Sequence, residues 1–139
     1  MKIDHFAVVA LLAVCIGCWG NDNLARVTGK VTLDDQPLGN ALVVFSPLSG
    51  GTTSYGRTSA EGNYEMMFSD SEKGAWLGEN AVRITTADVG TGSSSATKER
   101  VPTVYNTQTT LKAMVEKKRN VFDFSLKSNA GKIKQSIME

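Results

Sequence analysis

The sequence is poor in the side chains that most enzymes use for acid–base or nucleophilic chemistry. It holds one histidine, His5, and two cysteines, Cys15 and Cys18, all close to the amino terminus. A mature chain that begins at Cys18 keeps no imidazole. Ser/His and Cys/His catalysis and histidine-ligated zinc are therefore excluded for the mature chain.

The chain also has almost no excess of either charge. The chain carries 15 Lys and Arg against 14 Asp and Glu, a net charge of +1, which gives no basic surface of the kind that binds nucleic acid. Proline is rare, with 3 residues, whereas 13 glycines and 41% hydrophobic residues are ordinary for a globular chain with many turns. The length suits one compact domain.

The amino-terminal segment is the one long apolar run. Residues 6–17 read FAVVALLAVCIG without a charge. As a helix they would span about 18 Å, short of the roughly 30 Å hydrocarbon core of a bilayer. The segment is therefore interpreted as a signal peptide over residues 1–17. An ordinary secreted protein cut elsewhere and an uncleaved anchor are the alternatives.

The sequence CIGC at residues 15–18 resembles the lipobox of bacterial lipoprotein precursors, although Cys15 stands where leucine is usual. The resemblance implies cleavage before Cys18, a thioether-linked diacylglycerol on its sulfur and an acylated amine, which together give stable membrane anchoring. The domain is then exported and lipid-anchored to the cell membrane or outer membrane, in the periplasm or at the cell surface. Trp19, rather than Asp, follows the cysteine, which allows outer-membrane placement.

Beyond a short polar tether over residues 18–25, apolar residues alternate with period two, which predicts strands. Their number and spacing predict an all-β domain over residues 26–127, an antiparallel Greek-key β-sandwich of about seven strands. A hairpin or Greek-key arm is expected after the turn at 34–39, and a second hairpin at Gly62. Residues 128–139 form a polar tail. The predicted strands cover residues 27–33, 41–46, 54–58, 64–68, 81–87, 111–115 and 122–126.

Two stretches carry a resemblance to a known family. VTGKV at 27–31, DDQPL at 34–38 and ALVVF at 41–45 resemble the opening of carboxypeptidase regulatory-like domains. GRT at 56–58 with EGNY at 61–64 is similar to the second hallmark of that family. The resemblance implies a transthyretin-like (prealbumin-like) sandwich. The carboxyl-terminal part is similar to that of small lipoproteins of planctomycete bacteria, which implies fold and location rather than activity.

Candidate binding residues are few. Trp76 lies in a glycine-rich loop and is a candidate stacking platform, together with Ser93, Ser94 and Ser95 in the loop at 88–98; Tyr105 is a further ligand-binding candidate. For Trp76 and Tyr105, packing at the edge or end of the sandwich is the favoured interpretation. For the stretch at 88–98, a simple connector is the favoured interpretation.

The charged turns offer weaker candidates. Asp34 and Asp35 are adjacent, but neighbours on a tight turn point in different directions, so a solvated turn is favoured over an acid/base pair. A calcium site from Asp34, Asp35, Glu61 or Asp70 lacks the usual ligand spacing. Lys117, Lys118 and Arg119 are interpreted as a solvated turn rather than an anion site.

The sequence thus predicts a non-enzymatic lipoprotein, without catalytic residues, metal or cofactor, whose domain is a structural or interaction module at the cell envelope. Its expected partners are the membrane, through the anchor, and an envelope protein or glycan. The alternative is a carbohydrate- or peptide-binding lipoprotein that uses the loops around Trp76 and Ser93–Ser95. A hydrolase is the least favoured hypothesis, because its usual residues are missing.

Overall fold

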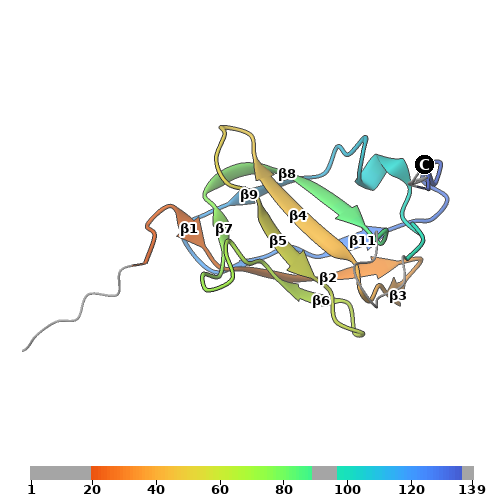
Figure 1. Cartoon of the computed structure of the whole chain (residues 1–139), viewed down its shortest axis with the longest axis horizontal. Coiled ribbons are helices and arrows are strands. Elements are labelled where there is room, and N and C mark those ends of the chain that lie inside the picture. Colours follow the sequence, from red (N-terminus) through yellow and green to blue (C-terminus); the bar gives the residue numbers. More distant parts are fainter. Residues whose placement is uncertain (1–19, 89–96, 136–139) are drawn as a thin grey trace, which may run out of the picture.

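The structure, a computed structural model, describes residues 20–88 and 97–135. The predicted signal peptide, Cys18 and the serines at 93–95 lie outside the described residues. What is described is all-β, with one short 3-10 helix, η1 (Thr103–Tyr105) (Figure 1). Among these residues, none forms a helix with the length and apolar character needed to cross a bilayer.

All seven predicted strands have counterparts: β2 (Val27–Leu33), β4 (Leu42–Pro47), β5 (Ser54–Arg57), β6 (Asn63–Glu65), β8 (Gly78–Thr85), β9 (Lys112–Val115) and β11 (Phe124–Leu126). Four shorter strands were not predicted: β1 (Leu24–Ala25), β3 (Gln36–Pro37), β7 (Ala75–Trp76) and β10 (Asn120–Val121). Each of the four has only two residues, too few to show a period of two.

The strands form two larger sheets and one small one. One sheet is antiparallel, in the order β5-β4-β8-β9. The other is built around β2, which pairs with β3 and β6 antiparallel and with β10 and β11 parallel. The small sheet joins β1 to β7.

The prediction of purely antiparallel pairing is wrong for β10 and β11. The chain leaves β9 in one sheet and enters β10 in the other, so that it then runs in the same direction as β2. Between β10 and β11 the ladder is interrupted, and there the Asp123 carboxylate accepts a hydrogen bond from the Lys30 N–H at 2.8 Å. Between β9 and β10 the chain thus crosses from one sheet to the other instead of forming a hairpin within one sheet.

The predicted hairpin at Gly62 forms only in part. Tyr55 and Met67 exchange two backbone hydrogen bonds, of 2.9 and 2.7 Å, but β5 otherwise pairs with β4 and β6 with β2. The arm predicted after the turn at 34–39 is also divided between the two larger sheets, because β2 belongs to one and β4 to the other. Its turn nevertheless makes a tight β2–β3 hairpin, with Asp34 and Asp35 at positive φ as a two-residue loop requires.

The core lies between the two larger sheets. Phe45 of β4 is fully buried, and its ring lies 6.0 Å from that of Phe122 and 6.5 Å from that of Phe124, both from the β2 side. Buried side chains of both sheets surround these rings. They include Val27, Val31, Leu38, Val43, Met66, Val82, Ile84, Val101 and Leu126.

The tether expected over 18–25 ends earlier than predicted. Leu24 and Ala25 pair with Trp76 and Ala75, and the Asn23 carbonyl accepts the Leu77 N–H at 2.8 Å. Ala25 packs against the core, and this burial favours the pairing of the segment with the rest of the domain. The folded domain therefore begins within a few residues of Cys18.

Candidate functional site

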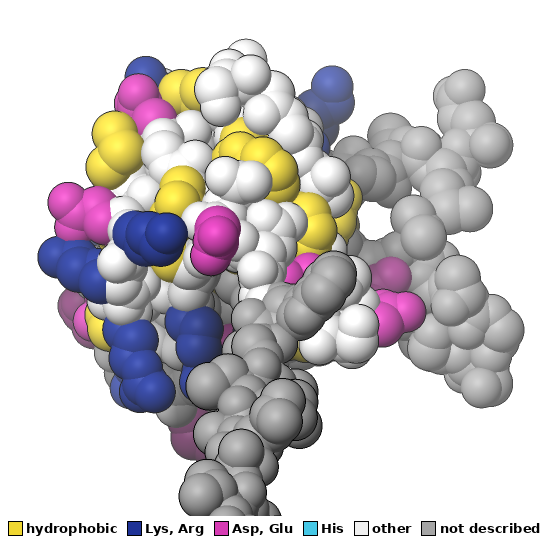
Figure 2. Space-filling view, turned by 90° about the vertical axis from the view of Figure 1, so that its left-hand side faces the viewer, with side chains coloured by type: hydrophobic (Ala, Val, Ile, Leu, Met, Phe, Trp, Pro, Cys, Tyr) yellow, Lys and Arg dark blue, Asp and Glu magenta, His cyan; other side chains and the backbone are white. Residues whose placement is uncertain are grey.

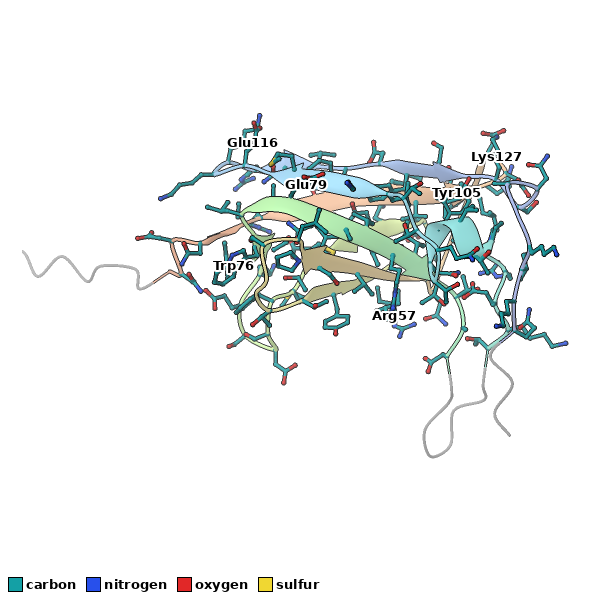
Figure 3. The ribbon with its side chains drawn as sticks, turned by 90° about the horizontal axis from the view of Figure 1, so that it is seen from above. Arg57, Trp76, Glu79, Tyr105, Glu116 and Lys127 are labelled. Atoms are coloured by element: carbon teal, nitrogen blue, oxygen red, sulfur yellow. The ribbon has the colours of Figure 1, made fainter. Side chains whose placement is uncertain are left out.

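The two predicted ligand-binding aromatics lie at opposite ends of the domain (Figure 3). Trp76 belongs to β7, next to β1 and before the start of β8. Tyr105 belongs to η1, which follows the loop beyond the far end of β8. The eight residues of β8 rise about 26 Å at roughly 3.3 Å each. The structure therefore does not bring Trp76 and Tyr105 into one site.

Trp76 is half-buried and packs against two neighbours. Its ring stacks on Phe68, with 6.0 Å between ring centroids and an interplanar angle of 29°. A Cβ placed on Gly51 would lie 3.5 Å from atoms of the indole, so the Gly51 backbone also runs against the ring. This is the geometry of an aromatic folded over the sheet edge, as the sequence favoured.

We expect Trp76→Ala to lower the free energy of unfolding by about 2 kcal/mol, because it removes a stacked, half-buried ring. Trp76→Phe should retain much of the contact with Phe68 and lose less. Chemical denaturation followed by circular dichroism measures both variants. A Trp76→Ala variant as stable as wild type would show that the ring is free to act as a platform.

Tyr105 lies at the opposite end of the domain. It packs against the core, and its hydroxyl accepts a hydrogen bond from the Lys127 N–H at 3.2 Å. A hollow of ≈ 360 Å³ lies beside η1, lined by Thr103, Gln108 and Lys132 among others, but Tyr105 is not one of its lining residues. Tyr105 therefore ties the residues after β11 to the domain.

The two adjacent carboxylates bind different partners. Asp34 accepts hydrogen bonds from the hydroxyl and the N–H of Ser128, at 2.5 and 2.9 Å. These hydrogen bonds lower the pKa of Asp34. Asp35 pairs with the Lys127 ammonium at 3.2 Å. Both carboxylates therefore hold the chain beyond β11 onto the β2–β3 turn, and they do not form an acid/base pair.

The loop with Ser93, Ser94 and Ser95 departs from the far end of β8. Its flanking residues Asp88 and Thr97 pair with each other there, on the opposite end from Trp76. Near these flanks lies a hollow of ≈ 230 Å³, lined by Asn40, Thr86, Thr97, Lys98 and Arg100. Its lining is polar and hydroxyl-rich.

A residue that the sequence did not single out organises this end. Glu99 is buried, with 7% of its surface exposed. Its carboxylate accepts hydrogen bonds from the Thr85 hydroxyl, from the N–H and hydroxyl of Thr86 at 2.9 and 3.0 Å, and from the Val101 N–H at 2.9 Å. Burial opposes its ionisation, but the hydrogen bonds from Thr85, Thr86 and Val101 outweigh burial and lower its pKa.

The Glu99 backbone binds the carboxyl-terminal segment. The Gln135 side chain accepts the Glu99 N–H at 3.0 Å and donates to the Glu99 carbonyl at 2.9 Å. No Lys or Arg within residues 20–88 and 97–135 forms an ion pair with Glu99. A buried carboxylate that accepts backbone N–H groups in this way orders its loop, and nothing in the strand pattern indicates it.

The described part of the chain holds no group of three or more His, Cys, Asp or Glu side chains placed to bind a metal ion. No protein family, curated protein or solved structure matches the sequence or the fold.

Proposed function

We propose that the chain is a lipoprotein, anchored through Cys18, whose β-domain is a non-catalytic structural or interaction module at the cell envelope. The observation that carries the proposal is the apolar segment that ends at CIGC, only a few residues before the first strand of the folded domain. Such a segment exports the chain, and two or more acyl chains hold it at the membrane.

The fold proposed for the domain is the Greek-key sandwich of carboxypeptidase regulatory-like, transthyretin-like domains. In support, residues of the motifs that resemble this family make specific hydrogen bonds or take a specific backbone conformation. The Thr58 hydroxyl donates to the Leu38 carbonyl at 2.6 Å and accepts the Ala41 N–H at 2.8 Å. Gly62 takes a φ of 81°, and the Tyr64 hydroxyl donates to the Phe122 carbonyl at 2.5 Å.

The proposal of a non-catalytic domain rests on what the polar residues do. Asp34 and Asp35 hold the chain after β11, and Glu99 orders the loop before η1. The partners that these carboxylates have in the structure all belong to the fold itself, which supports a structural role rather than substrate chemistry.

The experiment that tests the anchor is metabolic labelling with palmitate in a bacterial host. Wild type should incorporate label and fractionate with membranes, whereas Cys18→Ser should lose the label, because the acyl chains are attached through this residue. Cys15→Ser is the matched control and should keep the label, since Cys15 is removed with the signal peptide. Label on Cys18→Ser, or loss of label from Cys15→Ser alone, would contradict the proposal.

A further inference from the structure

A basic turn lies at the end of the domain that carries β1. Residues 116–119 join β9 to β10, and Lys117, Lys118 and Arg119 are all exposed. Asn120 fixes the turn: its side-chain oxygen accepts the Glu116 N–H at 3.0 Å, and its amide donates to the carbonyls of Glu116 and Lys118 at 3.0 and 2.8 Å. The three cations are therefore presented on an ordered turn.

The turn is held directly against the start of the domain. The Asn120 N–H donates to the Arg26 carbonyl at 2.9 Å, and Arg26 follows β1. Figure 3 shows Glu116 at the same end as Trp76, and Figure 2 shows Lys and Arg side chains gathered on one side of this end. The basic turn and the point where the chain enters from Cys18 thus share one end of the molecule.

Charged side chains of both signs lie at this end. On the opposite edge of β2 from β10, Glu65 is shared by Arg26 and, at 2.7 Å, by Lys73. Within the described residues, Lys117 and Arg119 form no ion pair, whereas Lys118 pairs with Glu116 at 2.8 Å.

Two carboxylates lie in the loop before β7. There the Glu72 carboxylate accepts the Asn21 N–H at 3.3 Å. Asp70 belongs to the same loop. The end that faces the anchor therefore has the basic turn between β9 and β10 and, in the loop after β6, the carboxylates of Asp70 and Glu72 followed by Lys73.

We propose that the turn of Lys117, Lys118 and Arg119 rests on the anionic phospholipid surface of the membrane that holds the anchor; this inference rests on the proposed lipidation of Cys18. Residues 18–24 reach at most about 21 Å when fully extended, which keeps this end near the headgroups. An anionic surface attracts the cations of the turn within a Debye length of about 10 Å and repels carboxylates such as those of Asp70 and Glu72. The domain then tilts with β9 and β10 toward the bilayer.

The test uses the full lipidated chain, reconstituted through its anchor into vesicles. One set contains phosphatidylglycerol and phosphatidylcholine, and the other contains phosphatidylcholine alone. A fluorophore is attached at Val121→Cys, a position 67% exposed and next to the turn, and a headgroup-labelled lipid quenches it. Each basic residue near the surface favours the bound orientation about fivefold, so quenching should be stronger in the anionic vesicles.

Two triple variants complete the design. The triple variant Lys117→Glu, Lys118→Glu and Arg119→Glu should abolish the difference between the vesicles. The triple variant Lys98→Glu, Lys132→Glu and Lys134→Glu, at exposed positions of the other end, makes the same change in net charge and should leave the difference intact. A fluorophore at Ile133→Cys should stay unquenched in both vesicles. Raised salt should weaken the quenching of the Val121→Cys chain that keeps all three basic residues of the turn.

Equal quenching at Val121→Cys in both vesicle types, or equal effects of the two triple variants, would overturn this inference and leave the anchor standing. A turn that binds polyglutamate but not anionic vesicles would also overturn it, because the partner would then be an acidic polymer. A wild-type chain that carries no acyl group and does not float with vesicles of either type would overturn the anchor itself.

Discussion

Gly29→Ala is expected to lower the free energy of unfolding by at least about 3 kcal/mol. A Cβ at position 29 would lie 1.8 Å from the Phe122 carbonyl oxygen and 2.7 Å from the Tyr64 hydroxyl oxygen. The first clash is with backbone, which no rotamer change relieves. It would push β2 away from the residues that follow β10, so the parallel pairing should weaken together with the Tyr64 hydrogen bond.

Urea denaturation followed by circular dichroism measures this loss. Gly20→Ala is the control, because a Cβ there would meet nothing within 4 Å, and it should leave stability unchanged. Tyr64→Phe should cost only about 1 to 2 kcal/mol, the value of one buried hydrogen bond. If Gly29→Ala were no more destabilising than Tyr64→Phe, the close approach of Phe122 to Gly29 would be wrong.

The alternating pattern around Gly29 predicts the position of a strand but not the strands with which it pairs. Alternation over 27–33 predicts a strand with one buried face, and β2 occupies those residues, with Val27 and Val31 fully buried. Alternation does not show which strands pair, because the partner of a strand depends on contacts far along the chain. The parallel partners of β2 are β10 and β11, which lie about ninety residues later in the sequence. Asn120, for example, pairs with Val27.

The candidate site residues were predictable in part. The favoured interpretation of Trp76 was a loop aromatic folded over the edge of the sandwich. In the structure the residue belongs to the short strand β7, and its ring stacks on Phe68. The separation of Trp76 from Tyr105 was not predictable, because sequence distance does not give the end of a sheet to which a loop belongs. Asp34 and Asp35 were interpreted as a solvated turn, yet they bind Ser128 and Lys127, about ninety residues later.

Glu99 was missed because it stands between Lys98 and Arg100, and such a run of charged residues is typical of an exposed loop. Its burial depends on Thr85 and Thr86 at the end of β8 and on the backbone of residue 101, all of which turn donors toward one point. Only the folded chain brings these groups together.

Glu99→Ala is expected to lower the free energy of unfolding by about 3 kcal/mol, because the buried N–H groups of Thr86 and Val101 would lose their acceptor. Glu99→Gln keeps one oxygen as an acceptor and should cost about half as much. The ionised carboxylate also makes stability depend on pH. Since the pKa of Glu99 is lower in the folded chain than its ordinary value of 4.5, its contribution is complete above that pH.

Below pH 4.5 this contribution is lost as the pH falls through the folded pKa of Glu99. The unfolding free energy of wild type should therefore fall more steeply between neutral pH and pH 3 than that of Glu99→Gln, and urea denaturation at a series of pH values measures the difference. Glu61→Gln, at an exposed position, is the matched control and should follow wild type. Parallel curves for wild type and Glu99→Gln would show that the buried carboxylate contributes nothing as an anion, and would leave its hydrogen bonds as ordinary neutral contacts.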